Sequence, residues 1–201
     1  MADKIDLKKV FKADYVAAKK PVLLTIGKAT YLAITGRGAP GGPEFQARVG
    51  ALYAMAYTVK MTRKFGGEQD YTIGSLEAQW WTDDGRCLPD APREQWCWTL
   101  LIRTPDFVKR AELANAAETL RKKAKAPEAS EVRLETLAEG RCVQMLHVGP
   151  YDREGDTMAV MTAFAESNGM TLHGLHHEIY ISDPRRVPAE KLKTILRQPV
   201  K

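Results

Sequence analysis

Strand-like patterns open both halves of the chain. Residues 22–26 and 31–35 are apolar runs separated by a Gly-Lys step, and residues 132–137 and 142–148 repeat this arrangement around a Glu-Gly step. Because glycine favours a tight turn between two such runs, the sequence predicts one β-hairpin at the start of each half.

A helical pattern follows each predicted hairpin. Pro43 and Glu44 begin a segment in which apolar residues recur at intervals of three and four, which is the period of an amphipathic helix. A second helix is predicted over 105–126, where Thr104 offers a capping hydroxyl just ahead of a proline in the first turn. A third helix is predicted from about residue 152 to residue 167.

The order of elements recurs along the chain. Strands are predicted at 71–81 and 95–103 after the first helix, and at 173–182 and 192–200 after the last. Both halves therefore read strand, strand, helix, strand, strand, which indicates an internal duplication. We expect an α+β fold in which two antiparallel sheets join side by side, with helices on one face and a ligand cleft on the other.

The length of the chain fits one large body. Its 201 residues can bury a substantial core. Residues 1–20 are expected to form an N-terminal arm, and residues 21–201 a single domain. Within that domain, we expect a first half at 21–104, the linking helix at 105–126 and a second half at 127–201.

Two glutamates stand at corresponding places in the two halves. Glu77 alternates with Leu76 and Ala78 on one predicted strand, and Glu178 alternates with His177 and Ile179 on another. Side chains two residues apart in a strand share a face. If the apolar faces pack against the helices, both carboxylates look into the cleft, with aromatic residues beside them.

Such a cleft suits two kinds of chemistry. Aromatic rings and carboxylates together attract planar or cationic molecules. Alternatively, an apolar pocket raises the pKa of a carboxyl group, which makes it useful as a general acid or base. A solvated sheet face is the third interpretation, which alternation alone leaves open.

The predicted catalytic residues are Glu178 and Glu77, and the predicted ligand-binding residues are Trp81, Tyr151, Tyr180, Gln79, Trp98 and Tyr31. Core packing is the alternative for Trp98 and Tyr31, and alternation does not decide whether Trp96 or Trp98 faces the cleft.

Composition and charge argue against several classes of partner. The chain carries 30 basic and 25 acidic residues, a net charge of +5, and its basic residues form dispersed pairs rather than a stripe. A nucleic-acid partner is therefore not expected. No run of eighteen apolar residues and no hydrophobic signal core are present, so we expect no membrane association and a cytoplasmic location.

Cofactor motifs are also missing from the sequence. The three cysteines include no C-x-x-C pair, and the cluster of His173, His176 and His177 lacks the further ligands of a zinc site. We expect neither a metal nor an organic cofactor. The sequence is compatible with a monomer or a homodimer.

Several motifs, in order along the chain, resemble one family. They lie at residues 4–9, 75–81, 96–107, 147–152, 178–184 and 191–197. They are similar to the GyrI-like small-molecule-binding proteins, and in particular to the stand-alone subfamily that includes cyclopropanoid cyclopropyl hydrolases. The resemblance implies tandem βαββ units around a ligand groove, a strand glutamate at Glu178 that faces the ligand, and an aromatic cage.

The resemblance also shapes the expected function. It implies a lipophilic aromatic ligand and hydrolytic opening of a strained cyclopropane ring. Our own hypothesis is that one of the two carboxyl groups protonates the developing oxyanion while the other orients the attacking water. Ser75 stands where the subfamily has proline, and Ala78 and Gln79 replace Gly and Leu, which weakens the transfer of this activity. The alternatives are a non-catalytic binder or sensor of drugs and, less favoured, a module that acts on a topoisomerase. About twenty residues precede the first strand, fewer than the DNA-binding domain of the regulator relatives needs.

Overall fold

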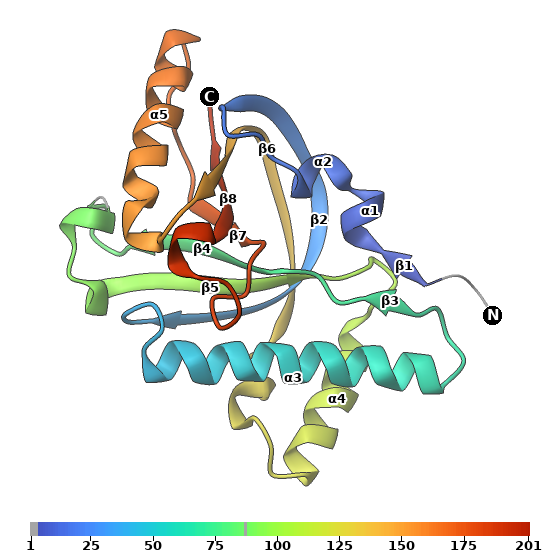
Figure 1. Cartoon of the computed structure of the whole chain (residues 1–201). Helices are drawn as coiled ribbons and strands as arrows, with labels where there is room; N and C mark the ends of the chain where they lie inside the picture. The colour runs from blue at the N-terminus through green and yellow to red at the C-terminus, as the bar shows by residue number, and fades with distance from the viewer. Residues whose placement is uncertain (1–3, 87) are drawn as a thin grey trace.

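Antiparallel strands close into a barrel in this computed structural model, which describes residues 4–86 and 88–201 (Figure 1). The strand order is β2-β5-β4-β7-β8-β6, and β6 returns to pair with β2. These strands are β2 (Val22–Arg37), β4 (Leu76–Thr82), β5 (Trp96–Arg103), β6 (Arg133–Val148), β7 (His176–Tyr180) and β8 (Lys193–Pro199).

Each half of the chain forms a βαββ unit, as expected. The first is β2, α3 (Pro43–Phe65), β4 and β5, and the second is β6, α5 (Glu154–Ser167), β7 and β8. Both helices lie on the outside of the barrel (Figure 1), where α3 packs against Trp98 and Leu100 in one core cluster and α5 against Leu196 in another. The predicted fold class is therefore confirmed. The chain also contains short 3-10 helices at Leu88–Asp90, Arg93–Gln95, Pro127–Glu131, Tyr151–Arg153 (η4) and Ala189–Lys191.

The two predicted hairpins are instead two continuous strands. β2 and β6 are each 16 residues long, and they pair with each other through both predicted turns, with Ile26 opposite Gly140 and Lys28 opposite Ala138. The prediction failed because the glycines accommodate an irregularity within a long ladder. Gly140, with φ of 71°, takes up a left-handed conformation without reversing the chain.

The linking helix begins later than its motif suggests. α4 spans Arg110–Lys122, whereas Thr104 joins the strand region by donating its backbone N–H to the carbonyl of Thr30. The backbone N–H of Lys109 is satisfied instead by the carboxylate of Glu112, at 2.8 Å. A capping motif thus identified the region of the helix but missed its first residue by one and a half turns.

The N-terminal segment, residues 4–18, lies against one end of the barrel (Figure 1). It contains β1 (Ile5–Asp6), α1 (Leu7–Val10) and α2 (Lys12–Tyr15), and β1 pairs with β3 (Tyr71–Thr72). The side chain of Tyr15 is buried against Ile179 and Ile195 on the inner face of the barrel. The face away from the helices is therefore the interior of the barrel, not an open cleft.

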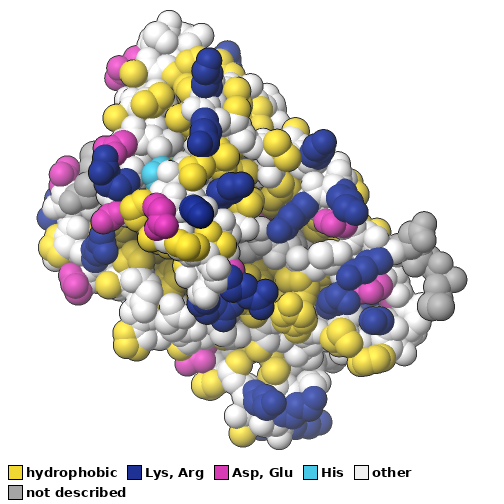
Figure 2. Space-filling model, viewed as in Figure 1, with side chains coloured by type: hydrophobic (Ala, Val, Ile, Leu, Met, Phe, Trp, Pro, Cys, Tyr) yellow, Lys and Arg dark blue, Asp and Glu magenta, His cyan; other side chains and the backbone are white. Residues whose placement is uncertain are grey.

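Three further features of the structure are the distribution of surface charge, the character of the helices and the burial of the cysteines. Basic side chains in the view of Figure 2 form separate groups with acidic and apolar side chains between them. Within residues 4–86 and 88–201, none of the helices is long and apolar enough to span a bilayer. Cys97 and Cys142 are buried free thiols, whereas Cys87 lies outside the described residues.

Candidate functional site

The two predicted catalytic glutamates point to opposite faces of the sheet. In the ladder between β4 and β7, Ala78 lies opposite Glu178 and Glu77 lies opposite Ile179. Directly opposed residues share a face, and neighbours along a strand do not. The expectation that both carboxylates line one cleft is therefore wrong, because Ala78, not Glu77, is the residue of the first half that lies across from Glu178.

Glu178 faces the helices among polar and aromatic partners. Its carboxylate accepts a hydrogen bond from the Tyr180 hydroxyl at 2.7 Å, and the Nε2 atom of His176 lies 3.3 Å from its other oxygen. The ring of Tyr151, from η4 (Tyr151–Arg153), meets the ring of Tyr180 edge to face at 5.8 Å between centroids. We call this group, together with Glu154, Trp80 and Thr194, the outer site.

Glu154 supplies a second carboxyl to the outer site. It is the first residue of α5 and is buried, with 8% of its surface exposed. Burial, followed by the nearby charge of Glu178, raises the pKa of Glu154 to about 9. At neutral pH, Glu154 therefore keeps its proton beside Glu178, an arrangement of two carboxyl groups that suits general acid and base chemistry.

Buried polar atoms gather in the outer site: Trp80 Nε1, Glu154 Oε1, His176 Nδ1 and Thr194 Oγ1. Thr194 interacts with Glu154, and Trp80 with the Tyr180 hydroxyl, whereas His176 Nδ1 has no hydrogen-bond partner in the described part of the chain. Ladder pairing brings Trp80 opposite His176 and Thr194 opposite Tyr180. An unsatisfied buried polar group costs about 1–3 kcal/mol, so a ligand that supplies a partner to His176 Nδ1 gains from it.

Aromatic side chains frame the outer site. Trp80 stacks on Phe45 from α3 at 5.8 Å between centroids and meets Trp96 edge to face. On the other side Tyr151 is 40% exposed, and burial of the rest, then the charges of Glu154 and Glu178, raise the pKa of its phenol to about 12. Rings from both halves therefore reach the pair of carboxyl groups, with Tyr151 at the solvent boundary.

The remaining predicted ligand residues lie elsewhere. Trp98 is fully buried beneath α3, donates its indole N–H to the carbonyl of Gly38 and packs against Phe45. Tyr31 and Gln79 belong to the barrel interior with Glu77, and Trp81 shares that face farther along β4. Of the eight predicted residues, the structure thus brings Glu178, Tyr180 and Tyr151 together in the outer site.

Several outer-site residues were missed by the sequence reasoning. Trp80 shares the helix-packed face of β4 with Ala78, and that face carries the site. Glu154 follows the Gly149-Pro150 break, at the start of a predicted helix. An acidic residue there is explained by its favourable interaction with the helix dipole, so nothing in the sequence indicates a role at a site. His176 and Thr194 become visible only through the register of β7 with its neighbours.

Other candidate sites are weaker. Within residues 4–86 and 88–201, no group of three or more His, Cys, Asp or Glu residues is arranged to hold a metal ion. A surface hollow of about 500 Å³ is lined by His147, Arg153 and Thr157, and another of about 450 Å³ by Lys12, Val16 and Gln144. Both ring nitrogens of His147 are already engaged, by Thr157 and by the Pro150 carbonyl.

Comparison with solved structures gives near relatives along the whole chain. An uncharacterized conserved protein from Listeria innocua is 41% identical, with a TM-score of 0.92, and the match covers 98% of this chain and 100% of that one. A hydrolase from Listeria innocua is also 41% identical, with a TM-score of 0.88 over 98% of this chain and 100% of that one. The EcmrR C-terminal domain, 13% identical over 90% of this chain and 97% of that one, shares the fold at a TM-score of 0.59.

Sequence comparison identifies the family. No functionally curated protein matches the chain. The family model described as the GyrI-like small molecule binding domain matches residues 20–201, which include every strand of the barrel and the whole outer site. The chain therefore belongs to the family of GyrI-like small-molecule-binding domains.

Proposed function

We propose that this protein binds a planar aromatic small molecule at the outer site and hydrolyses it. The observation that carries the proposal is the buried pair of Glu154 and Glu178, set among aromatic rings and buried polar side chains. One carboxyl that keeps its proton beside another is the arrangement that general acid and base catalysis requires. The relatives from Listeria innocua that are described as hydrolases support an enzymatic role.

The aromatic rings favour flat ligands. Tyr151 and Tyr180 present a ring edge and a ring face at one side of the site, and Trp80 and Phe45 form a stacked pair at the other. Such rings bind planar molecules through stacking and favour positive charge over their faces. The carboxylate of Glu178 adds attraction for a cationic group.

A strained cyclopropane fused to a dienone is the substrate class that best uses this pair. Water bonds to the methylene carbon of the ring while the carbon–carbon bond breaks, and the electron pair passes through the dienone to its carbonyl oxygen. Glu154 gives its proton to that oxygen, and Glu178 takes the proton that the water loses. Transfer of this proton from Glu178 to Glu154 restores both groups, so the net reaction adds one water and consumes no cofactor.

Incubation with a cyclopropanoid such as yatakemycin, followed by mass spectrometry, tests the proposal. We expect a product heavier by one water, formed over many turnovers, and a loss of kcat of about 100-fold or more in Glu178→Gln and in Glu154→Gln. Glu166→Gln is the matched control, because Glu166 is an exposed acid on the same helix. Failure of the wild-type protein to turn over, or full activity of Glu178→Gln, would contradict the proposal.

A non-catalytic binder is the second candidate function. It is favoured by the edge-to-face pair of Tyr151 and Tyr180 beside the carboxylate of Glu178, an arrangement that holds lipophilic cations without any reaction. Saturable quenching of tryptophan fluorescence by an aromatic cation, with the compound recovered unchanged and with weaker binding to Glu178→Gln, would identify this function.

A further inference from the structure

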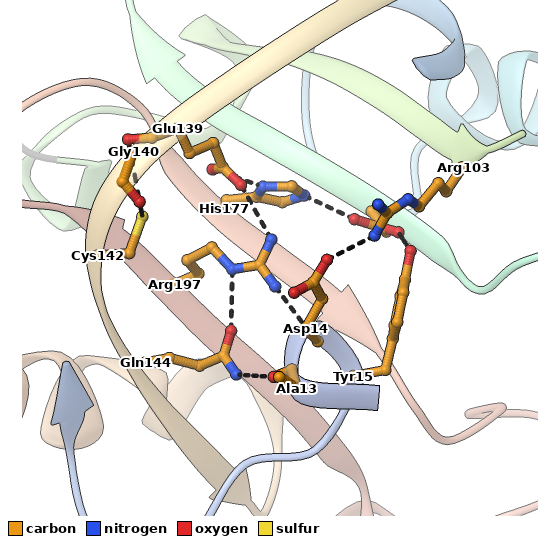
Figure 3. Close-up of polar contacts among 11 residues, drawn as sticks. Ala13, Asp14, Tyr15, Arg103, Glu139, Gly140, Cys142, Gln144, His177 and Arg197 are labelled. Carbon is orange, nitrogen blue, oxygen red and sulfur yellow. Dashed lines mark hydrogen bonds and ion pairs between the residues drawn. The ribbon is translucent and has the colours of Figure 1, made fainter. Parts of the chain in front are cut away.

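A chain of charged and polar side chains crosses the interior of the barrel (Figure 3). It lies on the opposite face of the sheet from the outer site. His177 has no exposed surface, and its Nδ1 lies 2.9 Å from Glu139 while its Nε2 lies 3.1 Å from Glu77. Arg197 donates to Glu139 and to Gln144, both at 2.9 Å. We call these five residues the inner network.

The inner network is held together by opposite charges. Burial alone would lower the pKa of His177, but the adjacent Glu139 and Glu77 raise it to about 9. His177 and Arg197 are then two cations facing two carboxylates, so the buried group carries no net charge. Breaking such a pair strands a charge in the interior, which costs several kcal/mol. The network therefore has one preferred arrangement.

The N-terminal segment completes this arrangement. The Tyr15 hydroxyl donates to Glu77 at 2.8 Å, and the carbonyl of Asp14 accepts from Arg197 at 2.7 Å. The carboxylate of Asp14 accepts from Arg103 at 2.6 Å, and the ring of Phe11 lies 3.7 Å from the same guanidinium. Residues from outside the barrel thus supply partners to Glu77, Arg197 and Arg103, and Figure 3 shows Asp14 and Tyr15 pointing toward this group.

The inner network and the outer site meet in β7. This strand has five residues, and its ladder with β4 has four residue pairs. His177 faces inward, and its two neighbours along the strand, His176 and Glu178, face the outer site. Any displacement of His177 moves the backbone that carries Glu178. Because catalytic and binding groups need placement to within about 0.5 Å, the anchoring of His177 matters for the outer site.

We propose that Tyr15 is a positioning residue for the outer site. It acts through Glu77 and His177, which anchor β7 from within the barrel. The N-terminal segment therefore helps to position the ligand-binding residues on the opposite face of the sheet. This inference rests on the proposed function of the outer site. It assigns to the N-terminal segment a role beyond covering the end of the barrel.

Tyr15→Phe is the variant that tests the inference, because it removes the hydroxyl that contacts Glu77 and keeps the ring. We expect kcat for the cyclopropanoid to fall about fivefold at unchanged KM, the change that corresponds to the loss of one hydrogen bond of about 1 kcal/mol. The same substitution should shift the NMR resonance of the indole N–H of Trp80, which lies opposite His176 in the ladder. A residue that only stabilised the fold would change neither quantity.

Two further variants sharpen the test. In a Glu77→Gln background, Tyr15→Phe should have no further effect, because the path through Glu77 is already cut. Tyr71→Phe is the matched control: Tyr71 is also buried, its hydroxyl interacts with Thr104 rather than with Glu77, and its strand β3 pairs with β1 rather than β7. It should leave kcat and the Trp80 resonance unchanged.

The outcomes separate this inference from the proposed function. Wild-type kinetics and an unshifted Trp80 resonance in Tyr15→Phe would overturn it, as would simple additivity with Glu77→Gln. If the wild-type protein neither binds nor turns over the compound, the proposed function fails. The Trp80 resonance then still decides whether Tyr15 positions the outer site.

Discussion

Glu154 is the residue whose protonation the fold alters most at the outer site. In the unfolded chain its carboxyl has an ordinary pKa of 4.5, whereas burial and Glu178 raise the pKa to about 9 in the folded protein. Between these values the folded state holds a proton that the unfolded state releases. The contribution of Glu154 to the free energy of unfolding therefore falls as the pH rises from about 4.5 to about 9.

The substitution Glu154→Gln should remove this dependence, because an amide does not titrate. From pH 6 to pH 8, the stability of the variant relative to that of the wild-type protein should rise by roughly 2.7 kcal/mol, since each pH unit contributes about 1.36 kcal/mol. Urea denaturation at the two pH values measures the difference, with Glu166→Gln as the exposed control on α5. Parallel stability curves for Glu154→Gln and wild type would show that Glu154 is ionised in the folded state.

At the residue scale, the sequence predicted part of the outer site. Glu178, Tyr180 and Tyr151 were identified correctly as neighbours, because alternation along β7 and the position after the glycine break place them. Glu77 and Glu178 were predicted to share a face because they stand at corresponding places in the two halves. A shift of one residue in strand register moves every side chain to the other face of the sheet. Register depends on long-range pairing, which no local pattern encodes.

Elements differ in how far local sequence determines them. The helix at Pro43–Phe65 and the strand at Lys193–Pro199 match their predicted ranges closely, since periodicity and flanking signals agree there. β2 and β6 do not, because each continues through its glycine to pair with the other half. A long strand shared by two units gains ladder hydrogen bonds that outweigh the local preference for a turn.

Two glycines within β2 should respond in opposite ways to alanine. A Cβ atom at Gly36 would overlap the indole ring of Trp98, whereas one at Gly27 would meet no atom within 4 Å. Gly36→Ala is therefore expected to lower the free energy of unfolding by about 2 kcal/mol. Gly27→Ala should be neutral or slightly stabilising. Thermal denaturation of both variants tests this account, and equal effects would contradict the packing of Trp98 against β2.

The pH dependence of stability is a property of the whole barrel. The contribution of His177, with a pKa raised to about 9 by Glu139 and Glu77 against burial, is complete below its ordinary value of 6.5 and is lost as the pH rises through about 9. Burial opposes ionisation of Glu139, but His177 and Arg197 lower its pKa to about 2. Its contribution is complete above 4.5 and is lost as the pH falls toward 2.

Together with Glu154, whose contribution already falls above pH 4.5, these groups predict a stability maximum near pH 4.5 and a decline that steepens from pH 6.5 toward pH 9. The free energy of unfolding, measured by urea denaturation from pH 3 to pH 10, checks this expectation. A maximum at pH 8 or above would mean that His177 is neutral in the folded protein, and that the inner network is not balanced as described.

At the scale of the molecule, the sheet of the barrel has two faces, the helix side and the barrel interior. The central claim is that the ligand binds on the helix side. A crystal structure with a bound planar aromatic cation, checked by competition with the cyclopropanoid substrate, decides it most directly. The account predicts a ligand on the helix side of the sheet, in contact with Glu178, Tyr180 and Tyr151. A ligand inside the barrel against Glu77 and Gln79, with the N-terminal segment displaced, would contradict it.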